Sequence, residues 1–221
     1  MTRRLATIAL LALVVSGCSS APTVAPSPTM DAAALSIPAL QGKTADESAR
    51  RSLEEFRALV TADDAATLGF TSADEAATAA LGRSLAIWAV PLDQLRAYDS
   101  AADPNGLLVD SGEVIVEVTV DGDVRSAVRV GKVGDVWQGE GLGWPALIGA
   151  LAAMHTTDDE FVVWVPAMNV YLVGRRSDGS LIVTPAFDYP EYELFTGDSL
   201  PANEAFGRLA GAAPTDGDVL N

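Results

Sequence analysis

The stretch from Val114 to Val130 reads VIVEVTVDGDVRSAVRV, and it decides the fold. Before Asp121-Gly122, valines alternate with Ile115, Glu117 and Thr119, and after it valines alternate with Arg125 and Arg129. This alternation is typical of two strands that each bury one face, and the Asp-Gly pair is a common turn between such strands. The sequence therefore predicts an antiparallel hairpin here.

Two registers of this hairpin place different side chains together. A two-residue turn at Asp121-Gly122 would pair Val120 with Asp123 and put valines opposite charged residues. A three-residue loop pairs Val120 with Val124, collects the valines on one face and leaves Glu117 near two arginines of the second strand. We favour the three-residue loop, with Asp123 in a left-handed conformation.

Other signals place helices and strands around the hairpin. Thr44 with Glu47, and Ser72 with Glu75, form capping boxes that predict two helices before it. Later segments predict a strand near 133–138, a helix at 145–154, a strand at 161–165, a hairpin around Asp178-Gly179 and a helix at 201–209. The order predicts an α+β fold: an antiparallel sheet built from hairpins, with helices packed on one face and an N-terminal helical segment.

Composition divides the chain into four segments. Residues 1–17 read as a signal peptide, and residues 18–42, rich in Ser, Ala, Thr and Pro, read as a flexible linker. Residues 43–213 are long enough for a single α+β domain. We expect residues 214–221 to form a disordered tail.

The first segment is followed directly by Cys18, the only cysteine of the chain. Arg3 and Arg4 precede an apolar run that is too short to remain as a membrane-spanning helix. The run Val15-Ser16-Gly17-Cys18 resembles the lipobox of bacterial prolipoproteins. The resemblance implies a diacylglyceryl group on the Cys18 sulfur, cleavage before Cys18 and acylation of the new amino terminus.

The lipoprotein resemblance also implies a location in the cell envelope. Several acyl chains together give a stable anchor, so Cys18 would hold the mature chain at a membrane. Ser19 stands where an aspartate would retain a Gram-negative lipoprotein in the inner membrane. If the source is Gram-negative, the resemblance implies the outer membrane, with the protein facing the periplasm.

Charge and cysteine content exclude several classes of function. The formal net charge is −16, and such an acidic surface repels phosphate backbones, so nucleic acid is not an expected partner. Anionic lipid headgroups are repelled too, which leaves the acyl chains on Cys18 as the membrane contact. With Cys18 lipidated, no thiol remains for catalysis or for cysteine-ligated zinc.

Two motifs resemble cofactor or metal sites but lack essential residues. The run at 141–146, GLGWPA, has the spacing of a dinucleotide-binding turn, yet no acidic residue follows the next predicted strand near Ala167. Asp103-Pro104-Asn105-Gly106 partly matches a calcium loop, but Ala101 and Gly112 stand where its first and last carboxylates belong. We therefore expect no cofactor and no metal.

His155 is the only histidine, and it directly follows the predicted helix at 145–154. A histidine there is favoured by the negative end of the helix dipole. Neither a Gly-x-Ser-x-Gly motif nor a second histidine is present to complete a catalytic or metal-binding set. We expect no catalytic role for His155.

Aromatic residues supply the candidate ligand-binding positions Trp144, Tyr189 and Tyr192. Trp144 lies at the glycine-rich turn, where a ligand can approach the backbone closely. Tyr189 and Tyr192 lie in the 187–195 loop, and aromatic side chains beside charged ones are typical of recognition surfaces.

The sequence favours a lipid-anchored envelope protein that binds or scaffolds an envelope protein or polymer and is not an enzyme. In that case removal of Tyr189 and Tyr192 should weaken binding. The alternative is a small envelope hydrolase that uses the acidic residues of the 187–195 loop, Asp188, Glu191 and Glu193. Loss of one of these should then abolish turnover while binding is retained.

Overall fold

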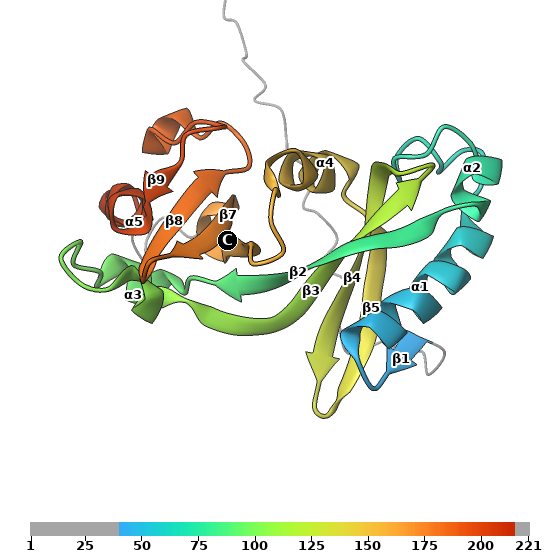
Figure 1. Cartoon of the computed structure of the whole chain (residues 1–221), viewed down its shortest axis with the longest axis horizontal. Helices are drawn as coiled ribbons and strands as arrows, with labels where there is room; N and C mark the ends of the chain where they lie inside the picture. Colours follow the sequence, from blue (N-terminus) through green and yellow to red (C-terminus); the bar gives the residue numbers. More distant parts are fainter. Residues whose placement is uncertain (1–39, 215–221) are drawn as a thin grey trace, which may run out of the picture. The chain divides into compact units, whose positions relative to one another are not determined.

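One mixed sheet of nine strands runs through the part of the chain that the computed structural model describes, residues 40–214. The strand order is β1-β5-β4-β3-β2-β6-β7-β8-β9 (Figure 1). The strands are β1 (Gln41–Gly42), β2 (Ala80–Ala89), β3 (Val109–Val120), β4 (Asp123–Val133), β5 (Val136–Gly143), β6 (Phe161–Val165), β7 (Val170–Ser177), β8 (Ser180–Pro185) and β9 (Leu200–Pro201). The α+β class predicted from the sequence is confirmed.

One strand pair departs from the predicted antiparallel sheet. β2 and β6 are parallel and pair from Ile87–Ala89 to Val162–Trp164, whereas the other neighbouring strands are antiparallel. Sequence patterns indicate hairpins because the two strands of a hairpin are adjacent in the sequence. They do not show which strands that are distant in the sequence become neighbours in the sheet. The β2–β6 pair joins the two groups of antiparallel strands into one sheet.

The register predicted for the β3–β4 hairpin is wrong. The turn has two residues, Asp121 and Gly122, both with positive φ, and Val120 pairs with Asp123. A bulge then leaves Arg125 without a direct partner, because Val118 pairs with Ser126 while Thr119 pairs with Val124. Because the bulge adds one residue to β4, the later valines of β4 lie on the same face as the valines of β3. The hairpin therefore has both a two-residue turn and a common apolar face.

The glutamate of this hairpin has partners other than those predicted. Glu117 is 3% exposed, and its carboxylate accepts the backbone N–H of Arg83 rather than meeting the β4 arginines. Arg125 forms ion pairs with Glu75 and Asp123. Arg125 therefore pairs with α2 and with the start of its own strand, and not with Glu117.

Five α-helices cover the sheet within residues 40–214. They are α1 (Ala45–Leu59), α2 (Ala73–Ala77), α3 (Leu92–Arg96), α4 (Pro145–Met154) and α5 (Ala202–Gly211). The hydroxyl half of both predicted capping boxes is confirmed: the Thr44 hydroxyl accepts the N–H of Glu47, and the Ser72 hydroxyl accepts the N–H of Glu75. The two glutamate carboxylates accept the backbone N–H of the preceding residue, Lys43 or Thr71, and not that of the N-cap residue. None of these helices has the length and apolar character needed to cross a bilayer.

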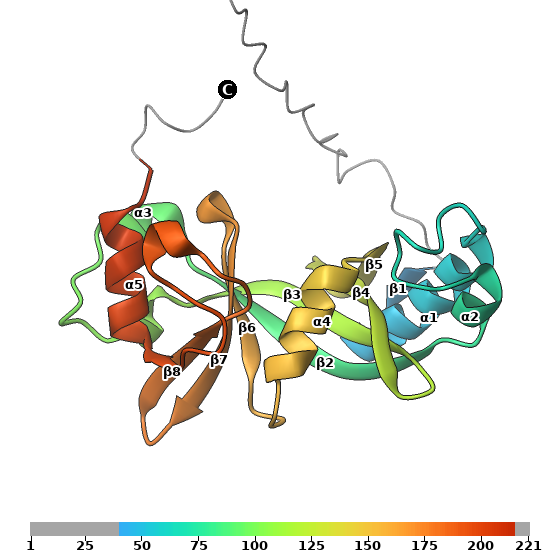
Figure 2. The same ribbon diagram turned by 90° about the horizontal axis from the view of Figure 1, so that it is seen from above.

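Helices lie on both faces of the sheet, so the prediction of one covered face is wrong. α1 and α2 pack on Val116, Val118 and Val128, while α4 packs on the opposite side, on Ile115 and Ala127. Figures 1 and 2 show α4 between strands β3–β5 and strands β6–β8, with α1 and α5 on the outer sides. Three apolar clusters result, one under α1 and α2, one under α3 and α5, and one under α4.

Topology explains the position of α4. The chain leaves β5 near one edge of the sheet and must enter β6 on the far side of β2, so it crosses β4, β3 and β2. The opposite face of β4 is already occupied by α1. The crossing therefore uses the free face, and the apolar residues Ile148 and Leu151 of α4 are fully buried there.

The folded part begins before the predicted boundary at residue 43. Gln41 and Gly42, which were assigned to the linker, form β1 and pair with Gln138 and Trp137. Leu40 is buried and its carbonyl accepts the Ser48 hydroxyl of α1. The predicted signal peptide, most of the linker, Cys18 and the tail from residue 215 lie outside the described residues.

Candidate functional site

A cavity of about 260 Å³ lies between the C-terminal end of α4 and strands β7 and β8. We call it the α4 cavity. It is lined by Ala153, Met154, Thr156, Glu160, Val173, Arg175, Ile182, Thr184, Gly197 and Ser199. Both apolar and charged side chains are thus present around one small space, which is the usual composition of a ligand pocket.

The β7–β8 hairpin builds one wall of the α4 cavity by simple alternation. Val173 pairs with Thr184, and Arg175 pairs with Ile182, so these four side chains lie on the same face. The alternate residues Leu172, Leu181 and Val183 belong to the apolar cluster under α3 and α5 instead. The hairpin predicted around Asp178-Gly179 is confirmed; both turn residues have positive φ, and the turn fixes this register.

Glu160 is held rigidly in the opposite wall. Its carboxylate accepts the backbone N–H of Thr156 at 2.6 Å and of Thr157 at 3.2 Å, and the Thr156 hydroxyl at 3.2 Å. These contacts cap the turn between α4 and β6. A carboxylate fixed in this way can accept a further donor from the cavity without losing side-chain entropy.

His155 lies behind Glu160 and does not reach the solvent. Its side chain is 2% exposed, Nδ1 lies 3.1 Å from the Arg83 guanidinium, and Nε2 lies 3.9 Å from a Glu160 carboxylate oxygen. A guanidinium can only donate, so Nδ1 accepts and the ring proton sits on Nε2. This Nε2 has no hydrogen-bond partner within residues 40–214. Burial places His155 in a supporting position, and the helix C-terminal location predicted from the sequence is confirmed.

Arg175 provides the positive charge of the α4 cavity. Its side chain is exposed and makes no hydrogen bond or ion pair with any residue of the described part of the chain. Asp159 is a charged group near it: the pKa of Asp159 is lowered by hydrogen bonds from the Thr157 side chain and its own backbone N–H, and further by the Arg175 charge. Because no described residue accepts a hydrogen bond from the guanidinium, its donors remain available to a ligand beside the Asp159 charge.

Two hydroxyl groups complete the polar lining. Thr184 Oγ1 and Ser199 Oγ lie 2.9 Å apart and share one hydrogen bond. Because only one of the two protons is used in that bond, the other hydroxyl can donate into the cavity. Met154, Val173 and Ile182 contribute the apolar part of the wall.

A second group of interacting side chains, which we call the Arg129 cluster, lies on the α4 side of the sheet. It consists of Glu113, Arg129, Glu140, Trp164 and Tyr171. The Arg129 guanidinium is 2.5 Å from Glu113, 3.1 Å from Glu140 and 5.2 Å from the centre of the Trp164 ring. Trp164 and Tyr171 pair across β6 and β7, with ring planes 9° apart.

A bulge directs Glu140 toward Arg129. Arg129 pairs with Gly141 and Val130 pairs with Gly139, so Glu140 is the extra residue of β5. Partial burial raises the pKa of Glu140, against the lowering by Arg129, and Glu113 raises it further. Burial likewise raises the pKa of Tyr171. The arginine is already paired with two carboxylates, so this cluster braces the sheet and offers no free cation.

Trp144 has a strained backbone at the start of α4. Its φ is 57° and its ψ is 44°, a left-handed conformation that is unusual for a bulky residue. The ring is 41% exposed and lies over Gly141, where a β-carbon would stand 3.1 Å from the ring. Trp144 does not line the α4 cavity, and its role in binding stays a prediction.

The two predicted tyrosines lie close together but are turned inward. The rings of Tyr189 and Tyr192 have centres 6.4 Å apart, and both pack against the cluster under α3 and α5. Tyr189 is only 9% exposed. In the same loop, Asp188 accepts the backbone N–H of Thr196 at 2.8 Å. These contacts anchor the 187–195 loop, and no contact within the described residues ties its acidic groups into a catalytic pair.

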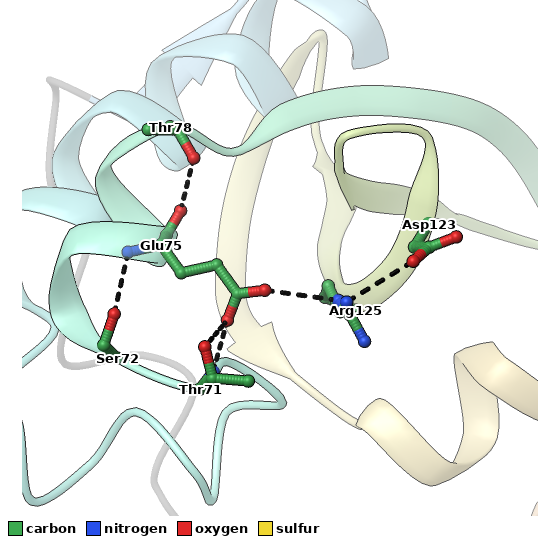
Figure 3. Close-up of polar contacts among 6 residues, drawn as sticks. All are labelled: Thr71, Ser72, Glu75, Thr78, Asp123 and Arg125. Carbon is green, nitrogen blue, oxygen red and sulfur yellow. Dashed lines mark hydrogen bonds and ion pairs between the residues drawn. The ribbon is translucent and has the colours of Figure 1, made fainter.

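The remaining polar networks are explained by local structure. Figure 3 shows Glu75 accepting from Thr71 and contacting Arg125, while Ser72 caps α2. These contacts fasten a short helix to the β3–β4 hairpin. At the motif that partly matched a calcium loop, Asp103 accepts two hydrogen bonds from Asn105, as in an ordinary turn.

Metal-ligating side chains do not gather in residues 40–214: no three of His, Cys, Asp or Glu are placed to hold an ion together. Comparison with known proteins adds no assignment, because no family model, no curated protein and no solved structure matches this chain. The function must therefore be argued from the α4 cavity and the sequence.

The residues of the α4 cavity were missed by sequence reasoning. Glu160, Arg175, Thr184 and Ser199 belong to four different segments, and only the tertiary fold brings them together. One local signal was present: Arg175 and Arg176 end a strand whose alternation places them on opposite faces. Nothing in the sequence indicated which of the two faces a cavity.

Proposed function

We propose that this chain is a lipid-anchored protein of the cell envelope that binds a small ligand in the α4 cavity and does not act as an enzyme. The lipobox-like run ending at Cys18 supports the location. One observation carries the binding function: the unpaired guanidinium of Arg175 and the fixed carboxylate of Glu160 line the same cavity. A charged side chain without a partner contributes little to the stability of the protein. In a concave site, such a side chain is therefore a recognition feature for a ligand.

The lipid anchor is tested by the mass and location of the mature protein. The chain and its Cys18→Ala variant are expressed in a bacterial host, and membrane and soluble fractions are compared. We expect the unaltered chain to begin at Cys18, carry acyl mass and sediment with membranes, and the variant to lose the acyl mass. A soluble, unacylated chain in both cases would contradict the anchor.

The binding function is tested by nuclear magnetic resonance on the full-length, isotope-labelled protein in detergent. The chain is titrated with the fraction below about 1 kDa from a digest of bacterial envelopes. We expect amide shifts concentrated at Val173, Thr184 and Gly197. Shifts elsewhere only, or none, would contradict binding in the α4 cavity, and new products in the digest would favour the hydrolase.

A matched pair of substitutions on α4 makes this test specific. Ala146 and Ala153 are both exposed on the same helix, but only Ala153 lines the cavity. Ala153→Trp should fill the mouth of the cavity and abolish the shifts, whereas Ala146→Trp should leave them unchanged. Both positions face solvent, so either substitution should change the free energy of unfolding by less than about 1 kcal/mol.

A further inference from the structure

We propose that the α4 cavity binds a small zwitterion, a molecule with one ammonium and one carboxylate group such as a free dipeptide. The inference rests on the proposed binding function and names the class of ligand. Arg175 would hold the carboxylate, and Glu160 would hold the ammonium group.

The Arg175 guanidinium and the Glu160 carboxylate have opposite charges, so a ligand that binds both must carry one negative and one positive group. Arg175 is unpaired, and a guanidinium binds a carboxylate through two parallel hydrogen bonds. Glu160 already has three donors, yet its two oxygens provide about four acceptor positions, so one position remains. Glu160 and Arg175 form no ion pair with each other within the described residues, which leaves both for the ligand.

The net charge of the protein decides between a zwitterion and a simple anion. The chain carries −16 charges, so an anion is repelled before it reaches Arg175. A zwitterion has no net charge and avoids this repulsion. A simple cation would be attracted, but it would leave the Arg175 guanidinium facing it at close range, which costs free energy.

The volume of the cavity limits the size of the ligand. A space of about 260 Å³ holds about nine water molecules at the density of the liquid, and it is smaller than pockets for drug-sized ligands. A dipeptide fits this limit. Val173, Ile182 and Met154 can contact its aliphatic carbons, and the hydroxyls of Thr184 and Ser199 can bind its amide.

Isothermal titration calorimetry with four probes tests the ligand class on the full-length protein in detergent. The probes are alanyl-alanine, its N-acetyl form, its C-terminal amide and glucose. We expect the unblocked dipeptide to bind at least about tenfold more tightly than either blocked form, and glucose not to bind. Equal affinity for all three peptides, or binding of glucose alone, would overturn the proposal.

Adjacent arginines provide the matched control. Arg175 lines the cavity, whereas Arg176 lies on the opposite face, over the rings of Trp88 and Phe161. Arg175→Gln should weaken the dipeptide at least about tenfold, as expected for loss of a charged hydrogen-bonded pair, and Arg176→Gln should change affinity less than about twofold. Equal effects of the two variants would overturn the assignment of Arg175.

A second pair of measurements assigns the ammonium group. Glu160→Gln should weaken the unblocked dipeptide but not its N-acetyl form, because only the former carries the ammonium group. A loss for both peptides alike would overturn the role of Glu160. If no peptide binds while envelope fragments still shift the cavity amides, the zwitterion is wrong and the proposed binding function stands.

Discussion

The backbone N–H of Tyr171 donates a hydrogen bond of 2.9 Å to the hydroxyl of Tyr189. This bond ties the 187–195 loop to β7, which is a structural role for a residue that the sequence marked as ligand-binding. Removing the acceptor leaves a partly buried N–H unsatisfied. We therefore expect Tyr189→Phe to lower the free energy of unfolding by about 1–3 kcal/mol, measured by urea denaturation.

Tyr192 provides the comparison for Tyr189. It lies in the same loop and packs on Tyr189, but its hydroxyl forms no hydrogen bond within residues 40–214. Tyr192→Phe should change the free energy of unfolding by less than about 0.5 kcal/mol. Equal losses in the two variants would show that the Tyr171 contact does not matter for stability.

Gly139 and Gly149 should respond in opposite directions to substitution by alanine. A β-carbon at Gly139 would lie 1.9 Å from the Ser52 hydroxyl oxygen of α1, so α1 would have to move away from β5. At Gly149, in α4, a β-carbon meets nothing within 4 Å. We expect Gly139→Ala to cost at least about 2 kcal/mol and Gly149→Ala to stabilise by about 0.5–1 kcal/mol. Thermal unfolding of the two variants measures both, and similar shifts would contradict the close packing of α1 on β5.

The raised pKa of Glu140 predicts a pH dependence of stability. A carboxyl group with a higher pKa in the folded chain binds its proton more tightly there, so the folded state loses stability as pH rises from the ordinary value of 4.5 through the folded value. Glu140→Gln removes this titration. We expect the stability of the variant relative to the unaltered chain to rise between pH 4 and pH 7. A difference that stays constant in urea titrations at the two pH values would contradict the burial effect.

Glu75 should show the opposite dependence. The Thr71 backbone N–H lowers the pKa of Glu75 most, followed by the Thr71 hydroxyl, with a further contribution from Arg125. A lowered pKa gives stability that is present above about 4.5 and lost as pH falls through the folded value. Glu75→Gln should therefore be less stable than the unaltered chain at pH 7, with the difference shrinking at lower pH. Amide exchange at Thr71 reports this locally, and equal protection in the two chains at pH 7 would contradict it.

Local sequence signals predicted the local parts of this fold well. The N-cap hydroxyl contacts predicted at Thr44 and Ser72 are confirmed, because a hydroxyl and the N–H three residues later are fixed by the first helical turn. The β3–β4 register was wrong, because a bulge at Arg125 satisfies both the compact turn and the apolar face. Such a bulge leaves no clear trace in an alternating pattern.

Features that depend on distant pairing could not be predicted. The parallel contact of β2 with β6 sets the crossing of α4 and thereby the α4 cavity. Exposure also separated the candidate aromatic residues: Trp144 faces solvent while Tyr189 is buried. In sequence both are aromatic residues beside polar ones, and only the packing around them distinguishes a surface position from an anchor.

The parallel pairing of β2 with β6 has a consequence for assembly of the chain. The antiparallel strands β2 to β5 follow one another in sequence and can pair as soon as they are made, but β6 follows α4 in the chain and becomes available to β2 only later. Until then, one edge of β2 is open to any suitable strand, including β6 from another molecule. Concentrated refolding should therefore yield dimers that have exchanged their β6–β9 segments, and dilute refolding should yield monomers.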